Sequence, residues 1–306
     1  MRYIDLFAGI GGFHYGLEKA GGFNCVWASE WNKYAAQIYA KQYPKTPLET
    51  SDIRTIDVKR IPEHELLCAG FPCQAFSVAG KRKGFNDTRG TLFFEIAKIL
   101  EAKKPPLVML ENVKGLLSHE RGRTFGTIIQ TLGKLGYWVE WQVLNSKHFG
   151  VPQNRERVFI IGHLRGKSTS QIFPIWENET IHSKKNASQS TYLKSPLRGQ
   201  GDKAIIELGC AMRGRGEGWK HELEFRKDNV ANQLTTVQKD SLVFSKDIRR
   251  LTPMECERLQ GFPDGWTKGI SDTQRYKCLG NAVTTNVITA IGHKIRKAHR
   301  EEALAV

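Results

Sequence analysis

The 306-residue chain lacks the features of a disulfide framework, a zinc site and a membrane span. Its six cysteines include no pair at C-x-x-C spacing, which argues against the common zinc motifs and against a disulfide-stabilised fold. No apolar run approaches the roughly 20 residues that a transmembrane helix needs. The chain opens directly on a strand-like segment, without the charged and apolar regions of a secretion signal. We therefore expect a cytoplasmic protein with no metal and no membrane partner.

Acidic residues are also scarce relative to basic ones. Aspartate and glutamate number 31 against 46 lysines and arginines, which gives a formal net charge of +15. A surplus of this size favours an anionic partner, and nucleic acid is the usual one. Charge alone leaves a generally basic surface equally open.

Short apolar segments alternate with helix-like segments in the first half of the chain. The apolar segments span residues 3–8, 25–29, 66–71 and 107–110, and the helix-like ones include 33–41 and 91–103. Buried strands that alternate with helices predict an α/β fold with a mostly parallel sheet. Residues 137–145 and 157–164 form two further candidate strands, and the loop between them predicts antiparallel pairing at the edge of the sheet.

The sequence changes character near Phe173. Residues 177–203 are rich in serine, threonine, lysine and asparagine, and residues 210–220 are rich in glycine and arginine. We expect a separate, loop-rich unit over residues 172–248. Thr252, with a glutamate three residues later, predicts the start of a helix, and a final helix is expected over about 283–299.

Residues 5–13 have the pattern of a strand, a glycine turn and the start of a helix. Glycine allows a ligand to approach the backbone closely at such a turn. His14 stands where a dinucleotide-binding fingerprint has its third glycine, which argues against a nicotinamide cofactor. Glu30 lies 19 residues after Gly11, near the distance at which an acidic residue binds the ribose of a nucleoside cofactor.

Two further positions fit such a cofactor. Trp31 offers a ring that can stack on adenine, and Asp52 with Ile53, near the end of a possible third strand, can hold the adenine edge. An ordinary strand end and a core aromatic residue remain open as the explanation of Glu30 and Trp31.

Residues 70–77 place Cys73 directly after a predicted buried strand. Ligands of an open α/β sheet bind at the carboxyl ends of its strands, although a lone cysteine is more often a buried apolar residue. Glu111 ends the next strand and is therefore expected at the same edge. A thiol beside a carboxyl suits attack on an electron-poor ring, because the thiolate adds while the acid shares a proton with a ring nitrogen.

Residues 153–157 place Arg155 and Arg157 two positions apart at the start of a predicted strand. Side chains at this spacing point to the same side of a strand and suit the binding of a polar base or a phosphate. A solvated cluster of charges is the alternative.

In this arrangement the chain resembles the bacterial cytosine-C5 DNA methyltransferases. The similarity runs through nearly the whole chain, and its most specific part is Pro-Cys-Gln followed by Glu-Asn-Val and Gln-x-Arg-x-Arg. Two departures are minor: Ala282 stands where serine is more usual, and Asn154 occupies a variable position. The matching blocks are residues 5–13, 30–31, 52, 70–77, 87–92, 111–113, 153–157, 250–264 and 280–283.

The resemblance implies a fold, a domain organisation and a biological setting. The fold is the Rossmann-like sheet of S-adenosylmethionine-dependent methyltransferases, with a small target-recognition domain. Residues 1–171, completed by 272–306, would form the catalytic and cofactor-binding domain, and residues 172–271 the target-recognition domain and hinge. The protein would act as a monomer on double-stranded DNA, encoded by a bacterium or phage as part of a restriction-modification system.

The chemistry that the resemblance implies begins with a cytosine flipped out of the duplex, because C6 is inaccessible inside the stack. Cys73 adds to C6, and Glu111 hydrogen-bonds N3 and the exocyclic amine. Arg157, and more indirectly Arg155, hold the base and the surroundings of Cys73. The activated C5 takes a methyl group from S-adenosylmethionine and then loses its proton by β-elimination.

The resemblance also implies the binding residues. The cofactor would be held by Phe7, Gly9, Gly11, Glu30, Trp31, Asp52, Ile53, Pro72, Leu92, Asn281 and Val283. DNA would be contacted by Lys81, Arg82, Lys83 and Arg89 in a closing loop, and by Arg213, Arg215, Thr235 and Thr236 in the recognition region.

Four other functions are alternatives to DNA cytosine methylation. The nearest is the RNA-methylating branch of the same family, which usually lacks a distinct specificity region such as residues 172–248. A catalytically dead relative is disfavoured by the intact Cys73, Glu111 and Arg157. The missing third glycine and the net charge argue against a nicotinamide oxidoreductase. An amino-methyltransferase would carry Asn or Asp before Pro-Pro and an aromatic residue where Pro72 and Cys73 stand.

Overall fold

The computed structural model describes residues 1–72, 92–167, 170–175, 207–214, 221–225, 230–231, 233–234, 242–244 and 248–304. The chain divides into two compact units. The first comprises Met1–Leu144, Glu156–Ile175 and Ile288–Val306, and the second comprises Asn145–Arg155 and Trp176–Val287.

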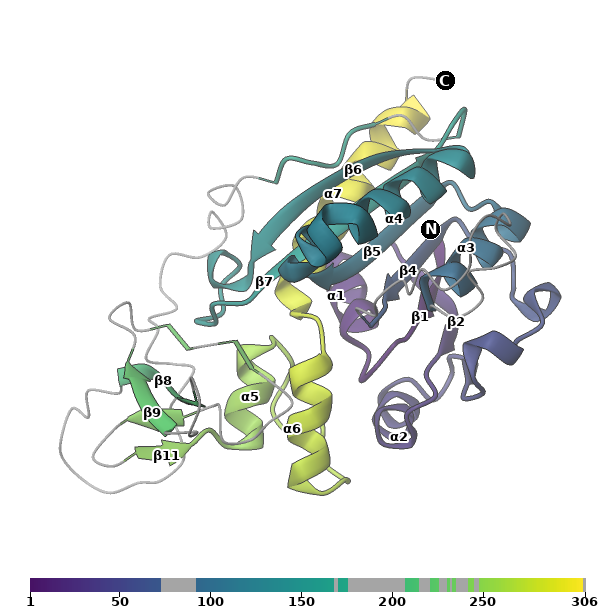
Figure 1. Cartoon of the computed structure of the whole chain (residues 1–306). Coiled ribbons are helices and arrows are strands. Elements are labelled where there is room, and N and C mark those ends of the chain that lie inside the picture. Colours follow the sequence, from purple (N-terminus) through teal and green to yellow (C-terminus); the bar gives the residue numbers. More distant parts are fainter. Residues whose placement is uncertain are drawn as a thin grey trace. The chain divides into compact units, whose positions relative to one another are not determined.

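A seven-stranded sheet forms the centre of the first unit, in the order β3-β2-β1-β4-β5-β7-β6 (Figure 1). β1 pairs in parallel with β2 and β4, β2 with β3, and β4 with β5, whereas β7 is antiparallel to β5. The predicted α/β class with a mostly parallel sheet is therefore confirmed. The strands are β1 (Arg2–Leu6), β2 (Asn24–Ser29), β3 (Leu48–Glu49), β4 (Leu66–Gly70), β5 (Leu107–Val113), β6 (Tyr137–Asn145) and β7 (Glu156–Leu164).

Helices lie on both faces of this sheet. Ile4 and Leu6 of β1 belong to one apolar core together with side chains of α3 and α4. Tyr3, which alternates with them, contacts His14 of α1 on the opposite face, with ring centroids 6.0 Å apart. Side chains that alternate along a buried strand need an apolar cover on each side, which these helices provide. The helices of this unit are α1 (Gly12–Ala20), α2 (Lys33–Gln42), α3 (Leu92–Lys103), α4 (Arg123–Lys134) and α7 (Thr285–Leu304).

The close packing of α7 on α1 depends on a glycine. A Cβ atom added at Gly292 would lie 2.7 Å from the Cβ of Ala20 and 3.1 Å from a methyl carbon of Leu17. Such distances are far below ordinary van der Waals contact, so any side chain at this position would force the two helices apart.

The second unit contains a four-stranded antiparallel sheet in the order β11-β10-β8-β9. Its helices α5 (Pro253–Leu259) and α6 (Asp272–Asn281) follow the strands in sequence. The predicted helix start at Thr252 is confirmed: its hydroxyl accepts the Glu255 N–H at 3.3 Å, and the Glu255 carboxylate accepts the Thr252 N–H at 2.7 Å. The strands are β8 (Glu207–Gly214), β9 (His221–Phe225), β10 (Leu242–Phe244) and β11 (Ile248–Arg250).

Three details differ from the sequence-based expectation. The final helix begins at Thr285 rather than 283, because Ala282 is extended (φ −64°, ψ 148°). The third strand ends at Glu49, so Asp52 caps the short 3₁₀ helix η1 (Ile53–Thr55) instead of ending a strand. β6 and β7 are neighbours at the edge of the sheet, as expected, but β7 also pairs antiparallel with β5, which the sequence did not indicate. The other 3₁₀ helices are η2 (Val58–Arg60), η3 (Lys114–Leu117), η4 (His119–Gly122) and η5 (Ser146–His148).

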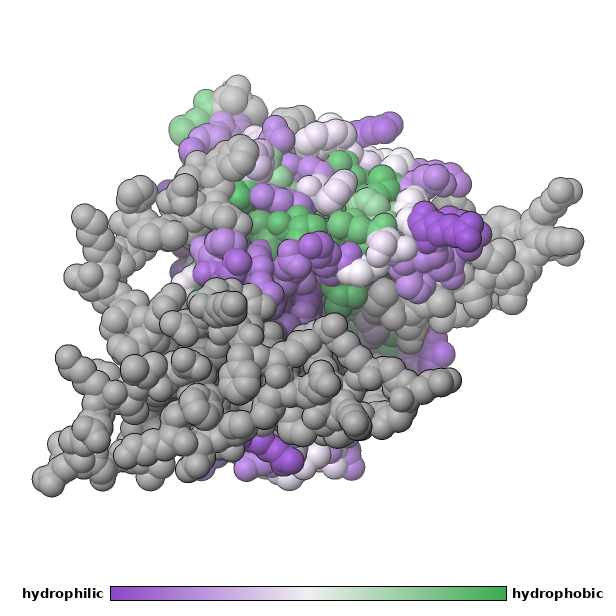
Figure 2. Space-filling model, turned by 60° about the vertical axis from the view of Figure 1, so that its left-hand side comes forward, coloured by the Kyte–Doolittle hydropathy of each residue, from purple (hydrophilic) through white to green (hydrophobic). Residues whose placement is uncertain are grey.

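The edge strand β6 carries exposed aromatic side chains. Trp138 and Trp141 are 47% and 48% exposed, and their rings lie 5.1 Å from His163 and 5.2 Å from Phe125, respectively. On the face drawn in Figure 2, hydrophobic residues gather in an area that hydrophilic residues border. Among the described residues, no helix combines the length and the apolar composition needed to cross a bilayer.

Candidate active site

The carboxyl ends of β1, β2, β4 and β5 meet at one edge of the first unit's sheet. Because these four strands are parallel neighbours, the residues that follow them are brought together although they are far apart in sequence. The structure places Phe7 after β1, Glu30 after β2, Phe71 after β4, and Glu111 near the end of β5. The sequence predicted the catalytic residues at this same edge.

The glycine turn after β1 has the backbone conformation that its sequence suggests. Gly9 and Gly11 have φ angles of 57° and 88°, in the left-handed region that favours glycine. Phe7 shares this region with φ 56°, which costs a non-glycine residue about 1–2 kcal/mol. A Cβ at Gly11 would also lie 2.8 Å from Cε2 of Tyr43. The turn is therefore strained, and α2 and the residue that follows it, Tyr43, pack closely behind it.

The Glu30 carboxylate links the end of β2 to this turn. One oxygen accepts the N–H of Gly9 at 2.8 Å, and the other accepts the N–H of Asn32 at 2.7 Å. Glu30 is only 8% exposed. Burial raises the pKa of Glu30, and the two backbone donors act against that shift. The carboxylate is thus fixed in orientation before any ligand arrives.

Asp5 is a second buried carboxyl close to Glu30, and the sequence pattern had suggested no role for it. It is fully buried, and neither of its oxygens has a hydrogen-bond partner among the described residues. Burial, with the charge of Glu30 as a smaller contribution, raises the pKa of Asp5 well above its ordinary value. Two neighbouring buried carboxyls at one strand edge suit a ligand that brings positive charge and hydroxyl donors.

The other predicted cofactor residues of the first unit differ in exposure. Trp31, beside Glu30, is 68% exposed and free to stack on a planar ring, whereas Ile53 is buried. Asp52 is paired with the guanidinium of Arg54, which lowers the pKa of Asp52. Pro72 is exposed and Leu92, the first residue of α3, is half-buried.

His14 explains why the third glycine of a dinucleotide fingerprint is absent. Its ring stacks on Tyr43 at 3.5 Å between centroids, and its Nδ1 lies 2.8 Å from the hydroxyl of Tyr39. Burial lowers the pKa of His14 to about 4, so the ring is neutral near pH 7. The imidazole therefore fills space behind the turn where a glycine would leave a gap.

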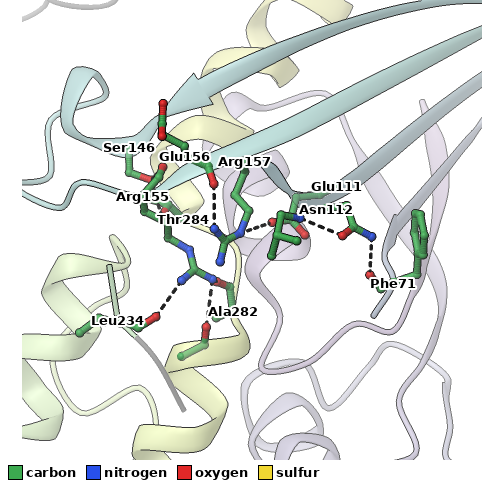
Figure 3. Close-up of polar contacts among 12 residues, drawn as sticks. Phe71, Glu111, Asn112, Ser146, Arg155, Glu156, Arg157, Leu234, Ala282 and Thr284 are labelled. Carbon is green, nitrogen blue, oxygen red and sulfur yellow. Dashed lines mark hydrogen bonds and ion pairs between the residues drawn. The ribbon is translucent and has the colours of Figure 1, made fainter. Parts of the chain in front are cut away.

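Glu111 and Arg157 form a buried ion pair across β5 and β7, as Figure 3 shows. Their Oε1 and Nε atoms lie 3.0 Å apart, and the two side chains are 11% and 8% exposed. Because β7 runs antiparallel to β5, it begins at the edge where β5 ends, and Val113 is the register partner of Arg157. Burial lowers the pKa of Arg157 while Glu111 raises it, and a guanidinium keeps its charge under such opposing influences.

Two contacts join the end of β5 to the segment that ends at Pro72. The side-chain amide of Asn112 donates to the carbonyl of Phe71 at 2.9 Å, which ties the end of β5 to the segment after β4 (Figure 3). Gly70 is the register partner of Glu111, and a Cβ at Gly70 would lie 3.4 Å from a Glu111 carboxylate oxygen. The described chain ends at Pro72, one residue before Cys73.

Arg155 lies in the second unit and is 1% exposed. Its guanidinium donates to backbone carbonyls of Leu234 at 3.1 Å, Gly280 at 3.0 Å and Ala282 at 2.7 Å. Asn281, between the last two, is exposed, and Val283 is buried. The two arginines that the sequence predicted to point together thus have different hydrogen-bond partners: a carboxylate for Arg157 and carbonyls for Arg155.

Several predicted residues lie outside the described part of the chain: Cys73, Lys81, Arg82, Lys83, Arg89, Arg215, Thr235 and Thr236. Arg213 belongs to β8, of which only the backbone is described.

Sequence reasoning missed two contributors to this site. Asn112 belongs to one of the motif blocks, but a single amide gives no sign of which carbonyl it will meet. Asp5, whose carboxyl has no partner among the described residues, could have been noticed in the sequence, because a charged residue inside an apolar strand is unusual and suggests a function.

Comparison with known proteins gives a consistent result. The sequence profile of the family described as C-5 cytosine-specific DNA methylase matches residues 1–208 and 201–297. The chain is 42% identical over 303 residues to the Type II methyltransferase M.SsoII of Shigella sonnei, covering 96% of this chain and 79% of that protein. It is 35% identical over 315 residues to the Type II methyltransferase M.HhaI of Haemophilus parahaemolyticus, covering 96% and 94%.

The fold is also shared with solved structures. The Dnmt2 methyltransferase of S. pombe superposes with a TM-score of 0.67 at 20% identity, covering 99% of both chains. At this identity the likeness concerns the fold alone.

We expect the stability of the protein to fall as the pH drops from about 6.5 to about 4 because of His14. The imidazole binds a proton in the unfolded chain at a pH where it stays neutral in the folded one, so acid favours unfolding across this window. The contribution reaches up to about 1.4 kcal/mol per pH unit. His14→Phe keeps a ring against Tyr43 and should show a shallower decline in urea unfolding measured at a series of pH values. A variant that declines as steeply as the wild type would contradict this role.

Proposed function

The chain belongs to the C-5 cytosine-specific DNA methylase family, and from this premise we propose that Cys73 is the nucleophile of its reaction. The protein is a DNA cytosine-5 methyltransferase. The observation that best supports the proposal for Cys73 is the buried pair of Glu111 and Arg157, whose strand neighbour Gly70 stands three residues before Cys73. The family match and the Type II relatives favour DNA over RNA as the substrate.

The roles that we propose follow the electron flow. The Cys73 thiolate forms a bond to C6 of a flipped cytosine, and the electron pair of the C5–C6 double bond moves toward C5 and the N3–C2 region. Glu111 shares a proton with N3 and so stabilises the charge that develops there. Arg157 holds Glu111 in place and presents a cation to the same region. When C5 has gained its methyl group, a base in the surrounding solvent takes the C5 proton. The electron pair of the C5–H bond re-forms the C5–C6 double bond, and the Cys73 sulfur leaves with the electron pair of its bond to C6.

We propose S-adenosylmethionine as the methyl donor, which supplies an electrophilic methyl group on a positively charged sulfur. The residues at the strand edge fit such a molecule. Glu30 presents a fixed carboxylate to ribose hydroxyls, Trp31 presents an exposed ring to adenine, and Asp5 is a buried carboxyl without a partner among the described residues. Gly9 allows close approach of the ligand to the backbone. The further cofactor residues that we propose are Phe7, Gly11, Asp52, Ile53, Pro72, Leu92, Asn281 and Val283.

We also propose that residues 1–171 with 272–306 carry catalysis and that residues 172–271 select the target sequence. Within these regions the DNA contacts are assigned to Lys81, Arg82, Lys83 and Arg89 on phosphates, and to Arg213, Arg215, Thr235 and Thr236 in recognition. The net charge of +15 supports a large polyanionic partner.

Trapping tests Cys73 directly. A long duplex in which 5-fluorocytosine replaces every cytosine contains the target whatever its sequence, and fluorine at C5 blocks the final elimination. With S-adenosylmethionine present, the wild type should form a DNA adduct that survives denaturing electrophoresis, and Cys73→Ser should form none. Cys278→Ser, a cysteine of α6, is the matched control and should trap as the wild type does. Equal adduct from Cys73→Ser and the wild type would sink the assignment.

Cofactor binding should depend on the charge of Glu30. Loss of a charge-assisted hydrogen bond costs about 1.5–3 kcal/mol, so Glu30→Gln should weaken S-adenosylmethionine binding roughly ten- to a hundredfold in calorimetry. Glu65→Gln changes a carboxylate at the amino end of β4 and should bind as the wild type does. Unchanged affinity in a folded Glu30→Gln protein would refute the role.

The DNA contacts can be sorted by their sequence dependence. Bisulfite sequencing of plasmid from cells that express the protein identifies the target, and binding is then measured on it and on single-base variants. Alanine at Lys81, Arg82 or Lys83 should weaken all duplexes alike and flatten the log-affinity against log-salt slope by about 0.9 for each contact. Alanine at Arg213 or Arg215 should relax the preference at one base pair, by about 1–3 kcal/mol for a good contact. If the lysine-rich segment changed the base preference and Arg213 or Arg215 weakened all duplexes alike, both assignments would be wrong.

A further inference from the structure

The carboxyl group of Asp5 is buried on the face of β1 that α1 covers. Asp5 is 0% exposed, and neither of its oxygens has a hydrogen-bond partner among the described residues. Its side chain points to the same side of β1 as that of Tyr3, whose ring contacts His14 of α1. Because nearly all buried polar side chains in proteins are hydrogen-bonded, an unpaired carboxyl at this depth indicates a role other than stability.

The titratable side chains around Asp5 bring no positive charge to it. Among the described residues, those that interact electrostatically with Asp5 are phenols, thiols and one carboxyl: Tyr3, Cys25, Glu30, Tyr39, Tyr43 and Cys68. Burial raises the pKa of Cys25 to about 12, and it raises the pKa values of the other thiol and of the phenols as well, so these groups are neutral near pH 7. His14, which contacts Tyr39 and Tyr43, is also neutral there, because burial lowers its pKa to about 4.

Asp5 and Glu30 differ in how well each can hold a negative charge. The Glu30 carboxylate accepts two backbone N–H groups, from Gly9 at 2.8 Å and from Asn32 at 2.7 Å. Asp5 has no such donor, and an isolated buried carboxylate is so unfavourable that the group takes up a proton instead. Burial, with the charge of Glu30 as a smaller contribution, accordingly raises the pKa of Asp5 well above its ordinary value.

The proposed cofactor brings a positive charge to this region. One carbon joins the sulfur of S-adenosylmethionine to its ribose, and the proposed function places the ribose hydroxyls on Glu30. Asp5 stands two residues before Phe7, the first residue of the glycine turn, which corresponds to about 7 Å along a strand. Charges at such a separation still interact appreciably in a protein interior, where the effective dielectric constant is far below that of water. A bound sulfonium therefore favours the ionised form of Asp5.

We propose that Asp5 holds a proton in the cofactor-free enzyme and releases it when the positively charged sulfur of S-adenosylmethionine binds. The inference rests on the proposed function, in which Glu30 binds the ribose. The O–H bond of the Asp5 carboxyl breaks, its electron pair stays on the oxygen, and the proton passes to solvent. S-adenosylhomocysteine has no charge on its sulfur and leaves Asp5 protonated. Asp5 thereby favours binding of the methyl donor over binding of the demethylated product.

Proton release is measured by calorimetry in two buffers that differ in their ionisation enthalpy. S-adenosylmethionine is titrated at about pH 7 into the wild type and into Asp5→Asn, which matches the neutral acid in size. The amino group of the ligand contributes equally to both proteins, so the difference isolates Asp5. The wild type should release up to about one proton more per bound ligand than the variant. Because a proton is released on binding, the affinity of the wild type should also rise more steeply with pH, by up to about tenfold per pH unit.

Two controls accompany this measurement. Asp57→Asn changes an exposed aspartate that caps η2 and accepts the Lys59 N–H at 3.0 Å, and it should release as many protons as the wild type. Titration of S-adenosylhomocysteine should show no difference in proton release between the wild type and Asp5→Asn.

Infrared difference spectroscopy tests the wild type without any substitution, which covers the case that Asp5→Asn does not fold. Addition of S-adenosylmethionine should remove the carbonyl band of a protonated carboxyl group. Enzyme labelled with ¹³C at the aspartate carboxyl carbon should show this band at a lower frequency, whereas labelling of the glutamate carboxyl carbon should leave it in place. The second result separates Asp5 from Glu30.

The outcomes distinguish this inference from the proposed function. Equal proton release by the wild type and folded Asp5→Asn, an equal Asp5-dependent release with S-adenosylhomocysteine, or an infrared spectrum without a lost aspartic acid band overturns the inference alone. A wild-type enzyme that does not bind S-adenosylmethionine overturns the proposed cofactor, and the inference with it.

Discussion

The arrangement of the site depends on one buried ion pair, between Glu111 of β5 and Arg157 of β7. Two charges in a protein interior cost several kcal/mol each in desolvation, and their attraction returns this only with good geometry. The antiparallel pairing of β5 and β7 supplies that geometry, because one strand begins where the other ends. An apolar pair could stabilise this position equally well, so the ion pair is better explained by the chemistry of the edge than by stability.

At the ends of β1 and β2, charged groups are also buried at a cost in stability. Asp5 and Glu30 are two buried carboxyls near one strained glycine turn, and burial raises the pKa of both. Such an arrangement lowers the stability of the ligand-free protein and favours a ligand that brings positive charge. The stacked rings of His14 and Tyr43 pack behind the turn and keep its backbone in the strained conformation. A dinucleotide-binding fold has a glycine at the position of His14 and lacks this packing.

Sequence patterns predicted the strands and helices because each of these elements depends mainly on residues that are close together in the chain. The bounds of β6 match the expected 137–145, and Glu111 lies at the sheet edge as strand order required. The partners of buried polar groups could not be predicted in the same way. Arg155 and Arg157 share a motif and a spacing, but which one meets a carboxylate depends on where β5 and the segment around residue 281 come to lie. Asp5 illustrates the same limit, since its isolation follows from the packing of neighbours distant in sequence.

The most direct test of the proposed mechanism is a crystal structure of the enzyme trapped on 5-fluorocytosine duplex DNA with S-adenosylhomocysteine. We expect a flipped base with a bond from the Cys73 sulfur to C6, the Glu111 carboxyl within hydrogen-bonding distance of N3, and Arg157 still paired with Glu111. A base that remains stacked in the duplex, or a Glu111 carboxyl turned away from the ring, would contradict it.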